Sequence, residues 1–412
     1  MSPEEILYLI CGLLIADFLF DQWLNYLNLR HGRSGLPEPL RGIYPEEEYH
    51  RSISYQRERQ RFSLWQSSFS FVLLLVMLLS GAFGWLDGWL RLYFENPLIL
   101  ALAFFGVLFV ASDLLSIPFQ WYSTFVIEEK WGFNKTTPAT FIKDKLKGYL
   151  LGMLIGGGIL AVLLYLILFI GPSFWLYFWA VMALFSLGAN MFYSSLILPL
   201  FNKLSPLPEG ELKEAILAYS RKVNFPVENM YVIDGSKRSS KANAFFSGLG
   251  KKKKIVLFDT LIDNHSTEEL VAVLAHEAGH YKKKHIVKGF VLSLLQSGLM
   301  LFLLSLLVFY APLSAALGGS EWAMHLNLLA FGLLFSPVSL LISLFTNKMS
   351  RKHEYEADAF AAETYGAIPL QEALKKLSVR NLTNLWPHPL YVRVHYSHPP
   401  LLRRLKALEK YV

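Results

Sequence analysis

Seven long apolar blocks constrain the fold of this chain more than any other feature. They cover residues 5–27, 63–86, 97–118, 148–171, 174–200, 289–312 and 326–346. Each is about as long as the roughly 20 helical residues that cross a hydrocarbon core of about 30 Å. Hydrophobic residues make up 53% of the chain and charged residues 17%, which excludes an ordinary soluble globular protein. The sequence therefore predicts a mainly α, multi-pass membrane protein with seven transmembrane helices.

Positive charge gathers on one side of this topology. Seven spans place the termini on opposite sides, and one side receives four long segments, at residues 28–62, 119–147, 201–288 and 347–412. These segments carry nearly every Lys and Arg, whereas the opposite loops carry only Arg91. By the positive-inside rule we expect the large segments to face the cytoplasm and the N-terminus to face out. The net charge of +7 thus has a membrane explanation, and no nucleic-acid partner is expected because the basic residues lack interleaved stacking aromatics.

The first apolar block is expected to be a retained span. Residues Met1–Glu5 are acidic, unlike the basic start of a secretory signal peptide. The single cysteine, Cys11, lies inside this block, so an intramolecular disulfide is impossible. A thiol buried in lipid without a nearby histidine is also a poor candidate for a protease nucleophile.

The string His276-Glu277-Ala278-Gly279-His280 carries the most specific chemistry. Residues four apart share a helix face, so both imidazoles can bind one Zn²⁺. Glu277 can then take a proton from the zinc-activated water. A chance match on a polar helix is the alternative. Ser266 and Glu269 have the spacing of a capping box, however, and predict that the motif lies within a helix that runs into the block at 289–312.

A two-histidine zinc site needs a third protein ligand, often a carboxylate. Glu354 and Asp358 lie four residues apart in a segment of helical composition and share a face. We interpret Glu354 as the third ligand and Asp358 as a residue that orients a ligand histidine. Glu356 points off that face. A solubilising surface helix would show the same spacing and is the alternative.

His398 is a further candidate in the C-terminal tail. It precedes Pro399-Pro400, which ends extended structure and can start a helix. His398 could donate a hydrogen bond to a developing oxyanion. The alternative is a loop histidine that packs near a helix start.

The residues outside the membrane predict a small sheet beside the zinc helix. Residues 209–223 are amphipathic, and three short apolar runs at 230–233, 243–246 and 255–258 are typical of strands. The expected organisation has four parts: a five-span membrane part (1–200), a cytoplasmic zinc-protease segment (201–288), two further spans (289–346) and a C-terminal segment that completes the zinc site (347–412).

Three motifs together resemble the CAAX prenyl protease 1 family, the integral-membrane zinc metalloproteases of M48 type. They are His276-Glu277-Ala278-Gly279-His280, Glu354-x-x-x-Asp358 and His395-Tyr396-Ser397-His398-Pro399-Pro400. The segments 239–246 and 255–261 and the seven-span layout are also similar to that family. The likeness covers almost the whole chain.

The resemblance implies seven tilted helices around a large water-filled chamber inside the membrane, closed on one side by a small α+β, zincin-like zinc metalloprotease domain. It implies one Zn²⁺ per chain, bound by His276, His280 and Glu354, with Glu277 as general base. Asp358 corresponds to an acid often described as catalytic, although the spacing favours an orienting role. His398 and Arg404 correspond to tail residues near the site.

The resemblance also implies that the substrate backbone pairs with the strand at Asn243, Ala244 and Phe245, as an added strand. Four polar residues within the apolar blocks, which are costly in lipid, are interpreted as lining the chamber, with helix–helix contacts as the alternative: Asp17, Asp21, Asp113 and Asn190.

The expected function is a zinc endopeptidase that cleaves a peptide or prenylated CAAX protein at the lipid bilayer. Its location would be the bacterial inner membrane or the endoplasmic reticulum membrane, with the zinc domain facing the cytoplasm. One alternative is a heat-shock-type quality-control protease, for which seven spans are too many. Another is a lipid-binding or transport barrel with structural zinc, against which the intact Glu277 argues. Oligomeric state and the roles of His285 and His353 do not follow from these motifs.

Overall fold

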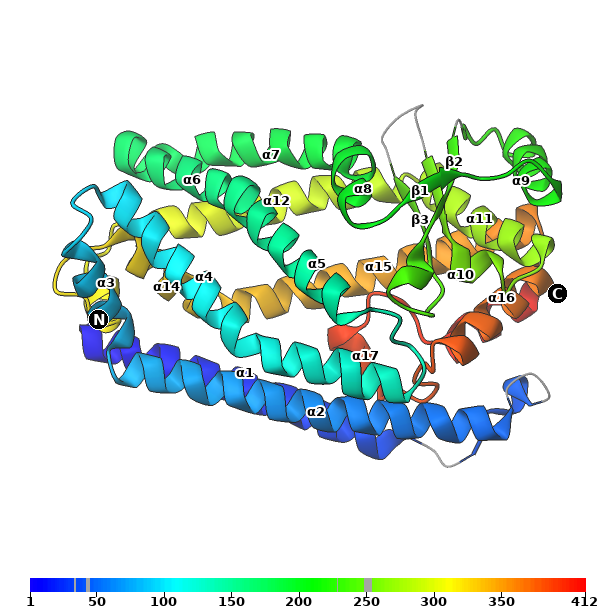
Figure 1. The fold of residues 1–412 in the computed structure, drawn as a ribbon, viewed down its shortest axis with the longest axis horizontal. Helices are drawn as coiled ribbons and strands as arrows, with labels where there is room; N and C mark the ends of the chain where they lie inside the picture. Colours follow the sequence, from blue (N-terminus) through cyan, green and yellow to red (C-terminus); the bar gives the residue numbers. More distant parts are fainter. Residues whose placement is uncertain (33–34, 42–44, 228, 248–253) are drawn as a thin grey trace.

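Long helices run side by side along the longest axis of the molecule (Figure 1). The computed structural model describes residues 1–32, 35–41, 45–227, 229–247 and 254–412. Its main membrane-region helices are α1 (Pro3–His31), α2 (Glu46–Leu79), α4 (Pro97–Tyr122), α5 (Pro138–Leu151), α6 (Gly157–Ile170), α7 (Phe174–Phe192), α12 (His285–Leu307), α14 (Met324–Leu334) and α15 (Ser336–Thr364).

Within the described residues, five helices have the length and hydropathy of a membrane span. A sixth follows if α14 and α15, which meet at a 50° bend, form one broken span. One of the five, Pro138–Phe201, covers 64 residues and doubles back at Gly171, whose φ of 68° is readily adopted by glycine. Its arms α6 and α7 lie side by side (Figure 1), so this segment supplies two crossings. The described residues thus offer the seven crossings that the sequence predicts.

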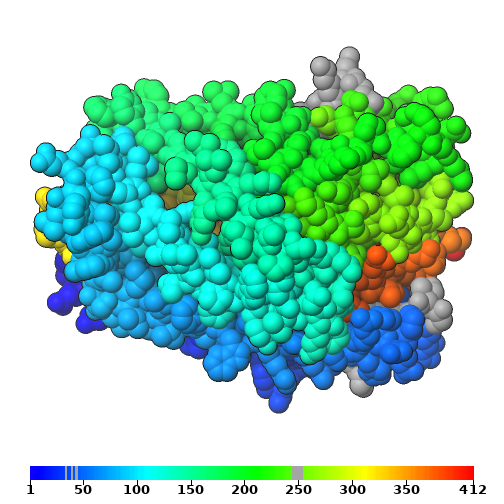
Figure 2. Space-filling model, viewed as in Figure 1, coloured from blue at the N-terminus to red at the C-terminus, as the bar shows by residue number. Residues whose placement is uncertain are grey.

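The spans bury few of their own side chains against one another. In the most apolar 18-residue stretch of each of the five spans, only 6–17% is buried inside the protein. Figure 2 shows the surface hollowed between α4 and the α5–α6 arm, where the brown-gold residues of α14 and α15 are visible in depth. A cavity of about 440 Å³ lies between α4 and α5. This open packing agrees with the expected chamber.

The polar residues within the apolar blocks have different surroundings. Asp113 lines the cavity between α4 and α5 and accepts hydrogen bonds of 2.5 Å each from Lys145 Nζ and the Tyr149 hydroxyl. The exposed Asp21 lies 3.6 Å from Nε2 of His395. Asn190 donates to a carbonyl of its own helix. Asp113 agrees with the chamber-lining interpretation. For Asp17, Asp21 and Asn190 that interpretation stays a prediction.

A four-stranded sheet lies at one end of the bundle, in the order β1-β2-β4-β3. Its strands are β1 (Leu204–Pro206), β2 (Asn229–Ile233), β3 (Ala244–Ser247) and β4 (Lys254–Phe258). β2 and β4 are parallel, whereas the outer strands are antiparallel to their neighbours. The three predicted strands are confirmed. The sequence missed β1, a three-residue edge strand that ends in Pro206, a residue that strands tolerate at an edge.

Met230, Ile255 and Leu257 of the sheet share one hydrophobic core with α11 (Thr267–Lys282), which is yellow-green in Figure 1. α11 buries Leu270, Val271, Leu274 and Ala275 in the core of this region. The other short helices are α3 (Ala82–Arg91), α8 (Leu198–Phe201), α9 (Glu211–Lys222), α10 (Asp259–Ile262), α13 (Pro312–Ala316), α16 (Ala367–Arg380), α17 (Pro389–His395) and α18 (Leu401–Leu408). Single 3₁₀ turns occur at Glu38–Leu40, Gly171–Ser173, Gly235–Lys237 and Glu409–Tyr411, and π-helical turns at Ser123–Glu128, Gly152–Gly156 and Tyr193–Ile197.

α11 and α15 approach so closely that the contact requires a glycine. A Cβ atom on Gly279 would lie 2.9 Å from Cα of Ala357, which is closer than packed carbon atoms tolerate. This contact places the C-terminal half of α11 directly against the part of α15 that carries Glu354. The two helices therefore present their side chains to one shared site.

Candidate metal centre

Both histidines of the H-E-x-x-H string project from α11. The predicted capping box is present, since the Ser266 hydroxyl accepts from the Glu269 backbone and the Glu269 carboxylate from the Ser266 backbone. The helix thus begins at Thr267, nine residues before His276, and is regular through the motif. Nε2 of His276 and Nε2 of His280 lie 3.1 Å apart. The four-residue spacing therefore aims both rings at one point.

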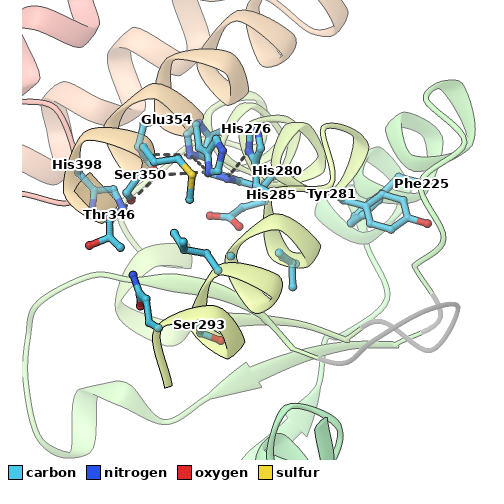
Figure 3. A pocket seen from close by; sticks show the side chains of 17 residues that line it. Phe225, His276, His280, Tyr281, His285, Ser293, Thr346, Ser350, Glu354 and His398 are labelled. Atoms are coloured by element: carbon cyan, nitrogen blue, oxygen red, sulfur yellow. Dashed lines mark hydrogen bonds and ion pairs between the residues drawn. The ribbon is translucent and has the colours of Figure 1, made fainter. Parts of the chain in front are cut away.

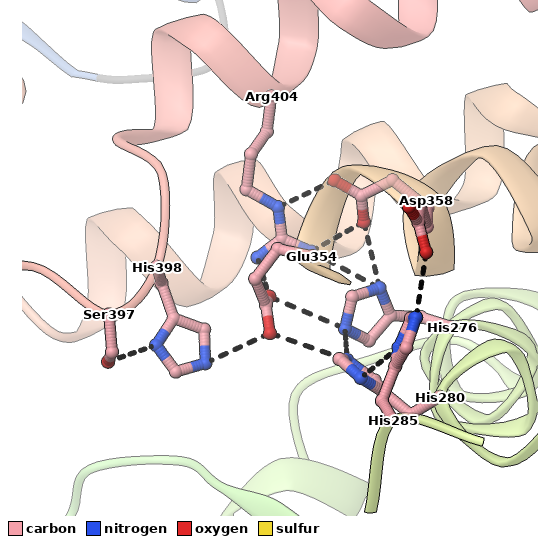
Figure 4. Close-up of polar contacts among 9 residues, drawn as sticks. His276, His280, His285, Glu354, Asp358, Ser397, His398 and Arg404 are labelled. Atoms are coloured by element: carbon pink, nitrogen blue, oxygen red, sulfur yellow. Dashed lines mark hydrogen bonds and ion pairs between the residues drawn. The ribbon is translucent and has the colours of Figure 1, made fainter. Parts of the chain in front are cut away.

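Glu354 approaches the two rings from α15. Its Oε1 lies 3.3 Å from Nε2 of His280, and its Oε2 lies 3.6 Å from Nε2 of His276. One ligand atom from each of the three residues falls within 4.8 Å of the others. Figure 4 shows the three side chains converging. Glu356, two residues along, is outside the cluster, as the sequence predicts.

The donor atoms of this cluster fit a divalent metal ion. Glu354 is 4% exposed, and its Oε2 has no hydrogen-bond partner among the described residues, although a buried carboxylate oxygen normally has one. Two imidazoles and a carboxylate are the protein ligands of many catalytic zinc sites. The neighbouring acids also favour positive charge here, because Glu354 and Glu277 raise the pKa of His280 despite the opposing effect of burial.

Asp358 contacts the other side of the His276 ring. Its Oδ1 lies 2.8 Å from Nδ1 of His276, so it faces the nitrogen that does not point at the cluster. Arg404 from α18 donates from Nε to Oδ2 at 2.8 Å and from Nη2 to Oδ1 at 2.6 Å. Burial lowers the pKa of Arg404, but the Asp358 carboxylate outweighs it and raises that pKa above its ordinary value. Asp358 and Arg404 thus form an ion pair on the Nδ1 side of the His276 ring.

His398 lies on the open side of the cluster. Its Nε2 is 3.4 Å from Oε1 of Glu354, and its Nδ1 is 3.0 Å from the Ser397 hydroxyl. The side chain is 65% exposed, so it is not a loop histidine packed against a helix start. It can therefore reach a bound molecule.

The cluster opens into a cavity of about 550 Å³ that continues into the membrane region (Figure 3). Glu277 lines it together with the two histidines and Glu354. The walls away from the cluster come from the membrane helices α12 and α15 and include Ile286, Gly289, Leu292, Gln296, Thr346 and Met349. Glu277 and the three potential ligands thus share one cavity with residues of two membrane helices.

A second cavity, of about 220 Å³, joins the cluster to the start of β3. Asn243 lines it together with His276, Glu277 and Glu354. Within the described residues, β3 pairs with β4 along one edge, and no strand pairs with its other edge. The Asn243 carbonyl accepts from the Phe258 amide, and Phe245 is paired with Val256. Because hydrogen-bonding direction alternates along a strand, the Ala244 and Phe246 backbones present their amides to the outer edge.

Comparison with known proteins agrees with the sequence motifs. Residues 25–203 match the family described as CAAX prenyl protease N-terminal, five membrane helices, and residues 206–412 match peptidase family M48. A CAAX prenyl protease 1 homolog of Oryza sativa is 38% identical over 96% of this chain and 95% of its own length. The CAAX prenyl protease 1 of Saccharomyces cerevisiae is 35% identical over 97% of this chain and 94% of its own.

The chain belongs to the CAAX prenyl protease 1 family.

The fold of this family member also matches a solved structure. The crystal structure of S. mikatae Ste24p superposes with a TM-score of 0.93 at 34% identity, covering 98% of this chain and 99% of that one. The protein is accordingly an integral multi-pass membrane M48 metallopeptidase of CAAX prenyl protease type. Family membership implies a zinc site and a peptide substrate. The non-catalytic barrel considered above is thereby excluded.

Three residues beside the cluster were not assigned from the sequence. Nδ1 of His285 lies 3.1 Å from Nδ1 of His280, and its Nε2 lies 2.9 Å from Oε2 of Glu356. The ring of His353 stacks on that of His285 at 3.9 Å. The sequence also suggested that the zinc helix feeds directly into a span. Instead, α11 ends at Lys282, and Lys284 adopts a left-handed φ of 57° before α12 begins, which turns His285 back toward α11.

Proposed function

We propose that this protein is a zinc endopeptidase that removes the C-terminal tripeptide from prenylated CAAX proteins or closely similar peptides. The observation that carries the proposal is the shared cavity: His276, His280, Glu354 and Glu277 face a space whose other walls are membrane helices. A substrate whose peptide end reaches the cluster can thus keep an apolar anchor at the bilayer. Relatives at about 35% identity over their full length carry the CAAX prenyl protease name.

In the proposed mechanism, His276, His280 and Glu354 hold the zinc ion. The bound ion would polarise the scissile carbonyl and lower the pKa of the attacking water to about 7. Glu277 takes the proton from that water and later delivers it to the leaving amine. The exposed His398 donates a hydrogen bond to the oxyanion that develops on the carbonyl oxygen.

Asp358 and Arg404 support this chemistry without touching the substrate. A ligand histidine that binds metal through Nε2 carries a proton on Nδ1, and a carboxylate that accepts this proton fixes both tautomer and ring orientation. Asp358 is placed to do this for His276. Arg404 holds both Asp358 oxygens and so fixes the carboxylate itself.

The substrate backbone pairs with the outer edge of β3 as an added strand. Extended peptides bind exposed sheet edges through main-chain hydrogen bonds. Asn243, which immediately precedes β3, lines the cavity that contains Glu277 and Glu354. A peptide paired with the outer edge of β3, where the Ala244 amide points, would therefore lead toward the metal-binding cluster.

The zinc domain faces the cytoplasm in this proposal, in the endoplasmic reticulum membrane or a bacterial inner membrane. The support is the distribution of Lys and Arg, which avoids the loops on the opposite side.

Cleavage of a farnesylated CAAX peptide by the purified protein tests the substrate assignment. The control is the same peptide without the lipid, and mass spectrometry identifies the products. We expect release of the C-terminal tripeptide, with a higher kcat/KM for the farnesylated peptide. Cleavage at other bonds, or equal turnover of an unfolded membrane-protein segment, would instead indicate a protease of quality-control type.

A further inference from the structure

We propose that His285 and Glu356 act together as positioning residues for the metal-binding ring of His280. In this arrangement each ligand histidine has its own carboxylate support: Asp358 contacts His276 directly, whereas Glu356 acts on His280 through a second histidine. The inference rests on the proposed zinc ligands and deepens that proposal. Neither His285 nor Glu356 belongs to the metal-binding cluster itself.

The ring nitrogens of His280 have separate partners. Its Nε2 faces the other two ligands, at 3.1 Å from Nε2 of His276 and 3.3 Å from Oε1 of Glu354. Nδ1 is therefore the nitrogen that carries the proton when the ring binds metal, and it needs an acceptor. The atom in reach is Nδ1 of His285, at 3.1 Å.

The requirement for an acceptor fixes the tautomer of His285. Its Nδ1 can accept from His280 only if its own proton resides on Nε2. That Nε2 lies 2.9 Å from Oε2 of Glu356, which is a carboxylate and can only accept. Donation therefore runs in one direction, from His280 to His285 and from His285 to Glu356. Every proton on this path has a matching acceptor.

The surroundings of His285 hold the ring in place. It is 5% exposed, and the ring of His353 lies parallel to it, at 3.9 Å with an interplanar angle of 10°. Lys284, immediately before it, has a left-handed conformation that separates α12 from α11. A side chain with this little freedom can set the orientation of its neighbour.

The path also joins three elements of the fold. His280 comes from α11, His285 from the membrane helix α12 and Glu356 from α15. Because α12 and α15 form the walls of the cavity, metal retention at His280 depends on the packing of the helices that surround the substrate. Asp358 gives His276 no such connection to α12.

Zinc affinity, measured by competition with a chelator, tests the proposal in the full-length protein. Losing a residue that orients a metal ligand typically weakens binding by about 10–100-fold. We expect weakening in that range for both His285→Ala and Glu356→Ala. Glu356→Gln keeps a carbonyl oxygen that can accept from His285 and should restore most of the affinity. The absorption spectrum of the Co²⁺-substituted protein should change in both alanine variants, because the His280 ring is free to reorient.

Lys352→Ala is the matched control. Lys352 is 76% exposed and lies 3.7 Å from Oε1 of Glu356, so its removal alters the charge beside Glu356 without touching the path. Affinity and spectrum should stay unchanged. If His285→Ala does not fold, Glu356→Ala decides the question, since the Glu356 side chain is 32% exposed and can be truncated without opening the core.

Unchanged zinc affinity and Co²⁺ spectrum in folded Glu356→Ala would overturn the inference, as would equal losses in the Ala and Gln variants. The Glu354→Ala variant separates this failure from a failure of the proposed function. If Glu354→Ala loses zinc while Glu356→Ala binds normally, only the positioning path is wrong. If Glu354→Ala also binds normally, the ligand assignment itself is wrong.

Discussion

Oδ1 of Asp358 lies 2.8 Å from Nδ1 of His276, while Nε2 of the same ring faces Glu354. The two carboxylates of the Glu354-x-x-x-Asp358 motif thus lie on opposite nitrogens of one imidazole. One is placed to bind the metal ion and the other to hold the ring. In the proposed site, this arrangement would give two acids four residues apart on α15 different roles.

Replacement of Asp358 should weaken zinc binding without removing a ligand. For Asp358→Ala we expect a loss of about 10–100-fold in affinity, because the Nδ1 proton of His276 loses its acceptor and Arg404 its partner. Asp358→Asn keeps one acceptor oxygen and should lose less. Chelator competition measures both. Glu363→Ala, an exposed acid on the same helix, is the control, and an equal loss in that variant would contradict a specific role for Asp358.

Glu354→Ala should lower the zinc content of the purified protein below one ion per chain, because a two-histidine site lacks the third protein ligand. Glu356→Ala should still contain about one ion when zinc is in excess, since all three ligands remain. Metal analysis after dialysis against zinc-containing buffer measures both. The ligand assignment is wrong if the two variants retain equal amounts.

The cluster of His276, His280 and Glu354 could be predicted from the sequence because much of its geometry is local. A four-residue spacing places His276 and His280 on one face, and the same spacing relates Glu354 to Asp358. The spans were predictable for a similar reason, since length and hydropathy are properties of continuous segments. That α15 lies against α11 did not follow from local spacing, and the resemblance to the family motifs supplied this prediction.

Contacts that depend on a turn between helices, or on residues far apart in the sequence, were not predictable. His285 lies five residues after His280, and on a continuous helix it would not face it. The left-handed conformation of Lys284 brings it back, and a run of three lysines gives no sign of this turn. Glu356 was recognised as lying off the ligand face, but its contact with His285 joins residues that are 71 positions apart. β1 was too short to show a strand pattern.

A proline at Ala244 should impair cleavage and leave zinc bound. The Ala244 amide points to the outer edge of β3, so proline removes a donor to the substrate while the pairing with β4 persists. We expect a higher KM for the peptide, with unchanged metal content. Phe245→Pro is the contrasting variant, because its amide faces β4 and its loss should destabilise the sheet. Normal turnover by Ala244→Pro would argue against strand addition at this edge.

Labelling of introduced cysteines should place the zinc domain in the cytoplasm. The side chains of Glu209 and Glu321 are 85% and 63% exposed and lie at opposite ends of the bundle. Both variants are made in a Cys11→Ser background and treated with a membrane-impermeant reagent. If the protein lies in a bacterial inner membrane, the reagent added outside intact cells should label Glu321→Cys and not Glu209→Cys. In sealed microsomes, whose cytoplasmic face is outside, it should label Glu209→Cys and not Glu321→Cys. The opposite result would overturn the orientation.

The central claim is that Glu277 is the general base of a zinc endopeptidase, and Glu277→Gln tests it most directly. The substitution is nearly isosteric and leaves the three ligands in place, but an amide cannot accept and return the proton. General acid–base catalysis typically contributes about 10²–10⁴-fold to the rate. Cleavage of a CAAX peptide should therefore fall by that factor, while zinc content and peptide binding are retained. Cleavage at the wild-type rate by the zinc-loaded variant would show that Glu277 is not the base and that the mechanism is wrong.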